Sequence, residues 1–99
     1  MSMMPDPAVG VFGISVAAEL VGTGVQNLRA YERAGLLEPR RTSGGTRLYS
    51  TDDIERLRRI ASLLDAGLNL SGVAMVLDLE LQNALLREEI HRRQTDEGR

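Results

Sequence analysis

The residues best suited to chemistry in this chain are its arginines. All twelve basic residues are arginine, and eight of them lie between residues 25 and 59. A guanidinium presents forked donors that match phosphate and the edge of guanine, so this segment favours contact with a polyanion. Residues 25–59 carry a net charge of +3, whereas residues 60–99 carry −3 and residues 1–24 carry −2. A local basic surface is therefore compatible with the overall net charge of −2, because exposed charges more than about 8 Å apart are largely screened.

Catalytic and metal-binding arrangements are not indicated. The chain has no cysteine, which excludes disulfides, thiolate metal sites and cysteine nucleophiles. It shows no shielded pair of carboxylates, no nucleophile beside a base and no phosphate-binding glycine loop. The sequence therefore predicts no enzyme, no cofactor and no metal site.

Length and hydropathy predict one small cytoplasmic domain. The chain has 99 residues, of which 42% are hydrophobic and 26% charged, as in an ordinary globular domain. A core of this size is thin, so a second subunit would help to complete it. No apolar run approaches the roughly 18 residues of a membrane span, and the first residues lack the pattern of a secretory signal.

Two short helices around a glycine-rich break resemble a helix-turn-helix. Ser15 is a good cap for a helix over residues 16–21, and Gly22-Thr23-Gly24 breaks that helix. A second helix is predicted over Val25–Ala34, with Gly35 at its end. This arrangement places the second helix where a recognition helix would lie.

The second helix has one apolar side and one polar side. Gln26, Arg29 and Arg33 share a face at helical spacing. An open helix face with arginine, glutamine and asparagine suits the DNA major groove.

A β-hairpin is predicted next. Two short strands flank Gly44-Gly45, and the hairpin carries Arg40, Arg41 and Arg47. Arginines near a flexible tip form a wing that can contact a phosphate backbone or enter the minor groove. Upstream, Val11–Ile14 fits a short strand or an extended entry.

Two further helical segments follow the hairpin. Ser50 begins a third helix that runs to about Ala66, and Arg56, Arg58 and Arg59 are expected to form its solvated face with local ion pairs. Ser71 is predicted to cap a fourth helix, whose pattern continues or restarts near Leu79. Its exposed apolar residues need a partner, and a coiled-coil dimer contact is the simplest one; they are Leu79, Leu81, Leu85, Leu86 and Ile90.

Four motifs occur in order over about residues 12–82: ISVAAEL, LRAYERAGLLEPRRTSGGTRLYS, DIERLRRI and GLNLSGVAMVLDLE. Together they resemble the MerR family of transcription regulators, and within it the HspR-like heat-shock repressors. The resemblance implies a mainly α fold with a small β-hairpin: a winged helix-turn-helix followed by two helices and a C-terminal, antiparallel dimerisation helix. Its boundaries on this sequence are a disordered tail over 1–10, the DNA-binding domain over 11–78, the dimerisation helix over 79–93 and a disordered tail over 94–99.

The resemblance also implies which residues meet DNA. The recognition helix carries over as Val25–Arg33 and the wing as Arg40–Tyr49. The DNA-binding residues expected from the patterns and the resemblance together are Gln26, Asn27, Arg29, Tyr31, Arg33, Arg40, Arg41, Thr46, Arg47 and Tyr49.

The function implied is a nucleoid-associated repressor that binds double-stranded DNA at an inverted repeat as a homodimer. HspR-like proteins act upstream of chaperone operons with an Hsp70 chaperone as co-repressor, which is an implication of likeness alone. Two departures from the family pattern matter. Ala30 stands where most MerR proteins have an aromatic residue. We also expect no effector domain for a small molecule, which favours repression over effector-driven activation.

Two alternatives stay open. One is an excisionase-like or developmental regulator that binds direct repeats as a monomer. The other is a chaperone modulator that uses the same fold to bind a co-chaperone instead of DNA, although the concentration of arginines in the wing argues against it.

Overall fold

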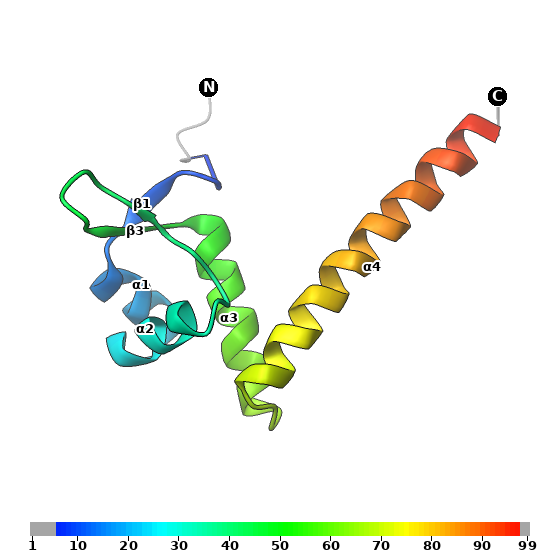
Figure 1. Cartoon of the computed structure of the whole chain (residues 1–99). Coiled ribbons are helices and arrows are strands. Elements are labelled where there is room, and N and C mark those ends of the chain that lie inside the picture. The colour runs from blue at the N-terminus through cyan, green and yellow to red at the C-terminus, as the bar shows by residue number, and fades with distance from the viewer. Residues whose placement is uncertain (1–5, 98–99) are drawn as a thin grey trace. The chain divides into compact units, whose positions relative to one another are not determined.

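The computed structural model describes residues 6–97 (Figure 1). Residues 1–5 and 98–99, which belong to the two predicted tails, lie outside the described residues. The chain divides after Gly67 into an N-terminal and a C-terminal compact unit. Among the described residues, the N-terminal unit holds three helices and three strands, and the C-terminal unit holds one helix.

The predicted helix-turn-helix is confirmed, with one correction at its start. Helix α1 spans Ile14–Val21 and helix α2 spans Val25–Arg33. The residue before α1 is Gly13, which makes no side-chain cap, so Ser15 lies inside the first turn and the prediction that it caps the helix is wrong. α2 ends at Arg33, one residue before the predicted end. Gly35 has the predicted role, because it adopts a left-handed conformation with φ 76° that lets the chain turn away from the helix.

Helix α3 spans Thr51–Asp65 and has the strongest start signal in the chain. The Ser50 hydroxyl accepts a hydrogen bond from the Asp53 amide at 3.0 Å, and the Asp53 carboxylate accepts one from the Ser50 amide at 2.9 Å. This reciprocal capping box satisfies two backbone donors and fixes where the hairpin becomes helix.

A three-stranded antiparallel sheet carries the wing. Strand β1 spans Gly10–Phe12, β2 spans Arg40–Arg41 and β3 spans Arg47–Ser50, in the order β1-β3-β2. The predicted hairpin is thus β2 and β3, closed by a hydrogen bond of 2.8 Å from the Thr42 amide to the Thr46 carbonyl. β1 adds a strand on the opposite edge of β3 and anchors the hairpin to the start of the domain. Gly10, which the prediction placed in the N-terminal tail, belongs to this strand and lies opposite Ser50.

The core of the N-terminal unit lies between its helices and the sheet. α3 packs against α1 and β3, and α1 packs against α2. Burial removes these apolar side chains from water, which is the main force holding so small a unit together. The buried members are Ala17, Ala18, Leu28, Tyr31, Leu36, Leu37, Tyr49, Ile54, Leu57, Ile60 and Leu63.

Two arginines of α3 fasten the other elements. Arg56 donates from Nε to the Leu36 carbonyl, and Arg58 donates from Nη2 to the Leu20 carbonyl at 3.3 Å. Both acceptors lie at or just beyond the end of a helix, where carbonyls lack an intrahelical partner. At these two positions the structure therefore shows hydrogen bonds to the backbone in place of the expected local ion pairs.

The close approach of β1 to β3 explains Gly10. A Cβ atom at this position would lie 2.7 Å from the Leu48 carbonyl oxygen, closer than real Cβ contacts. We expect Gly10→Ala to lower the free energy of unfolding by about 1–3 kcal/mol, measured by urea denaturation. Gly44→Ala is the control, because an added Cβ there meets only the Thr42 hydroxyl at 3.8 Å. Equal stability of the two variants would contradict this packing.

The C-terminal unit contains helix α4, which spans Leu70–Glu97 without interruption (Figure 1). The helical pattern therefore continues through Leu79, and residues 94–97 of the predicted tail belong to the helix. The Asn69 side chain accepts a hydrogen bond from the Gly72 amide at 2.8 Å, so Asn69 provides the cap that was predicted for Ser71. Across residues 6–97, no helix is long and apolar enough to cross a membrane.

Candidate nucleic-acid interface

Helix α2 presents a polar face to solvent. Gln26, Asn27, Arg29 and Arg33 are all exposed, as expected for the open face of this helix. Leu28, fully buried, anchors the opposite side in the core. An exposed helix face of this composition can bring forked and amide donors to base edges and phosphates.

Asn27 is already engaged within the turn of the helix-turn-helix. Its side-chain nitrogen donates to the Thr23 hydroxyl at 2.7 Å. Its amide oxygen stays available as an acceptor. Asn27 therefore ties the turn to the first turn of α2 as well as facing solvent.

The wing brings its arginines to one place. Arg40, Arg41 and Thr46 are exposed, and Arg47 is half-buried. Arg41 and Arg47 are directly opposite each other in the register of β2 and β3. The structure thus unites two of the three predicted wing arginines as a cross-strand pair.

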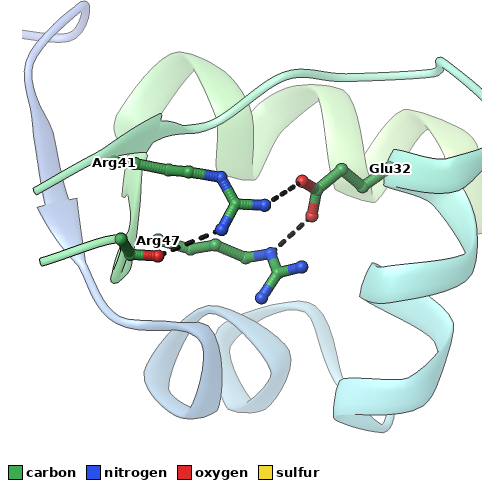
Figure 2. Close-up of polar contacts among 4 residues, drawn as sticks. Glu32, Arg41 and Arg47 are labelled. Atoms are coloured by element: carbon green, nitrogen blue, oxygen red, sulfur yellow. Dashed lines mark hydrogen bonds and ion pairs between the residues drawn. The ribbon is translucent and has the colours of Figure 1, made fainter.

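Glu32 links the wing to α2, a role that the sequence analysis missed. Figure 2 shows its carboxylate between the two wing arginines, with one oxygen 2.6 Å from Nη2 of Arg41 and the other 2.5 Å from Nε of Arg47. The three side chains join the last turn of α2 to both strands of the hairpin. The sequence offered no local signal for this link, because the contacts span 9 and 15 residues.

The electrostatics of this contact favour a charged Glu32. Partial burial alone would raise the pKa of the carboxyl, but hydrogen bonds from Arg47 and Arg41 and their charges outweigh it, so the pKa is lowered from 4.5. Because the pKa of Glu32 is lowered in the folded chain, the ion pairs contribute their stability at pH values above the ordinary pKa. They lose it as the pH falls through the lowered pKa. The link is therefore intact at neutral pH.

The predicted DNA contacts of Tyr31 and Tyr49 do not fit the structure. Tyr31 is 6% exposed and Tyr49 is fully buried. Both rings serve the core, where an aromatic side chain contributes a large apolar area. We therefore leave both out of the candidate interface.

Tyr49 has a buried hydroxyl for which the described residues offer no hydrogen-bond partner. Burial also raises the pKa of this phenol. Because an unpartnered buried hydroxyl costs about 1–3 kcal/mol, we expect Tyr49→Phe to stabilise the fold and to leave duplex binding unchanged. Thermal denaturation and a binding titration check both parts. A loss of affinity with unchanged stability would restore Tyr49 to the interface.

Helix α4 exposes large apolar side chains on two different faces. Leu79, Leu81, Leu85, Leu86 and Ile90 are 55–59% exposed. In a continuous helix with 3.6 residues per turn, Leu79, Leu86 and Ile90 share one face with Val76 and Asn83. Leu81 and Leu85 fall on the far side, so a single two-helix seam cannot contain all five predicted residues. The set with alternating spacings of three and four, here called the seam face, is Val76, Leu79, Asn83, Leu86 and Ile90.

The described surface shows no cluster of metal-binding side chains. Within residues 6–97, no group of three or more His, Asp or Glu side chains is placed to hold a metal ion. The candidate site is therefore the polar face of α2 together with the wing, joined by Glu32.

Comparison with known proteins identifies the family to which this fold belongs. The model of the MerR HTH family regulatory proteins matches residues 12–80, which include α1, α2, the wing and α3. The chain belongs to the MerR family.

Relatives and solved structures agree with the assignment. This MerR-family chain is 49% identical over 78 residues to the putative heat shock protein HspR of Streptomyces coelicolor, covering 78% of this chain and 52% of that protein. It is 39% identical over 67 residues to the transcriptional regulator GlnR of Bacillus anthracis, covering 68% of this chain and 52% of GlnR. The chain thus spans about half the length of these relatives.

Among solved structures, the N-terminal part of MtaN, the multidrug transporter activator of Bacillus subtilis, superposes with a TM-score of 0.65 at 29% identity. The match covers 85% of this chain and 89% of that one. The predicted winged helix-turn-helix fold is thereby confirmed, and the proteins matched are transcription regulators, not enzymes.

Proposed function

We propose that this chain is a transcriptional repressor that binds double-stranded DNA through α2 and the wing. The observation that supports it is the ion-paired link of Glu32 to Arg41 and Arg47. It holds the arginine hairpin beside the polar face of α2, so that both elements can meet one duplex. In such a complex α2 enters the major groove and the wing contacts the flanking backbone.

The proposed form is a homodimer on an inverted repeat. The seam face of α4 has the spacing of a two-helix contact, and its members Leu79, Leu86 and Ile90 are exposed in the single chain. A two-fold dimer reads two half-sites in opposite orientations, which corresponds to an inverted repeat.

The regulated genes are proposed from likeness. The 49% identity to a heat shock protein of the HspR type supports chaperone genes as targets and an Hsp70 chaperone as co-repressor. A cytoplasmic location at the nucleoid follows from this role.

Selection of bound duplexes from a random library tests the proposal. We expect an enriched inverted repeat, a complex with two protein chains by analytical ultracentrifugation, and affinity that falls steeply with salt as arginine–phosphate contacts release counterions. Added Hsp70 is expected to strengthen the complex. Direct repeats bound by monomers would favour the excisionase-like alternative. Binding to a co-chaperone with no affinity for any duplex would favour the chaperone-modulator alternative.

A further inference from the structure

We infer that Glu32 is a positioning residue that makes DNA binding selective. It fixes the wing to the recognition helix. Its negative charge also neutralises part of the positive charge of the wing, which weakens binding to DNA of any sequence. The inference rests on the proposed DNA-binding function. It assigns a role to an acidic side chain that lies within the basic surface. A carboxylate does not itself favour contact with a polyanion.

The register of the hairpin creates the need for a carboxylate. Arg41 and Arg47 are paired across β2 and β3, and like charges directly opposite each other destabilise a sheet. Glu32 gives one carboxylate oxygen to each guanidinium, at 2.6 Å and 2.5 Å (Figure 2). One side chain of α2 thereby offsets the repulsion and fixes both arginines.

The same contact extends to the tip of the wing. While Nη2 of Arg41 binds Glu32, its Nη1 donates to the Gly45 carbonyl at 3.0 Å. A guanidinium is planar and rigid, so Arg41 fixes the position of the hairpin turn relative to α2. Arg47 uses only Nε for Glu32, so in the proposed complex its terminal nitrogens can donate to phosphate.

Charge and position act in opposite directions on binding. The two arginines and Glu32 together carry a net charge of +1, and without the carboxylate they would carry +2. The additional charge would strengthen attachment to every duplex equally, because phosphate contacts carry no sequence information. A loosened wing would meanwhile no longer place α2 in one register on its preferred site. Selectivity, the ratio of the two affinities, should therefore fall.

Glu32→Gln tests this directly, with Glu38→Gln as the matched control. Glu38 is an exposed acid just before the wing, so its replacement changes the net charge equally without removing the ion pairs. For Glu32→Gln we expect tighter binding to an unrelated duplex, a slope of log K against log salt steeper by up to about 0.9, and a selectivity ratio reduced by about ten-fold. In the control, the selectivity ratio should stay at the wild-type value.

A second variant and a DNA-free measurement separate the possible outcomes. Glu32→Asp keeps the charge but shortens the side chain, so we expect it to lose selectivity without gaining affinity for unrelated duplex. It also serves if Glu32→Gln does not fold, as judged by circular dichroism. In both variants, amide hydrogen exchange at residues 42–46 should accelerate relative to the rest of the sheet.

An unchanged selectivity ratio in Glu32→Gln and Glu32→Asp would overturn the inference. So would unchanged exchange at the wing tip, whether or not the protein binds DNA. A wild-type protein without preference for any duplex would instead overturn the proposed function, and the two failures are thus distinguishable.

Discussion

Leu86→Asp is expected to lower affinity for the inverted repeat by on the order of 10²–10⁴-fold, the advantage that two linked half-site contacts have over one. Leu86 is 59% exposed and belongs to the seam face of α4, between Asn83 and Ile90. A carboxylate there would lose its hydration on forming the dimer, which is costly for an unpaired charge. The variant should be monomeric in sedimentation and should bind a single half-site as weakly as one wild-type subunit does.

Leu85→Asp is a stringent control for this prediction. The neighbouring leucine is 55% exposed, and the substitution is chemically identical. The two variants differ only in position, because Leu85 lies on the side of α4 away from the seam face. Dimerisation and binding should therefore survive. If Leu85→Asp dissociates the dimer and Leu86→Asp does not, the seam face has been assigned to the wrong side.

Arg29→Ala is expected to lower affinity by about 1–3 kcal/mol, the value of a bidentate contact to a base. Arg29 is exposed on the polar face of α2. The loss should be concentrated at one base-pair position of each half-site. At that position, the variant should bind all four possible base pairs with nearly equal affinity. Binding to a panel of single-position variants of the selected duplex measures this.

Arg47→Ala supplies the contrast. Its terminal nitrogens serve phosphates in the proposed complex, so its removal should weaken binding to all members of the panel similarly and reduce the salt slope by about one. A position-specific loss for Arg47→Ala, or a uniform loss for Arg29→Ala, would exchange the roles of the helix and the wing.

Local patterns predicted most of the fold. Glycines marked the break after α1 and the end of α2, and a hydroxyl followed by acids marked the start of α3. These signals act within one turn of helix, so they can be recognised without knowing the tertiary structure. The polar face of α2 was predictable for the same reason.

Contacts between distant residues could not be derived in this way. The partnership of Glu32 with Arg41 and Arg47 depends on the hairpin register and on the packing of α2 beside it. The burial of Tyr49 depends on which face of β3 meets the core, which a strand of four residues does not specify alone. The two faces of α4 became separable once the helix was known to be continuous.

At least four of the eight arginines between residues 25 and 59 have structural roles inside the folded unit. Two share a carboxylate and two donate to main-chain carbonyls, at positions 41, 47, 56 and 58. Exchange for lysine would preserve the formal charge and still be damaging at positions 41, 47 and 56. A compact ammonium lacks the Nε donor that Arg47 and Arg56 use and the two directed terminal donors that Arg41 uses. A charge-conserving mutational scan, with melting temperature recorded beside affinity, would therefore divide the arginines into those that build the domain and those that meet its ligand.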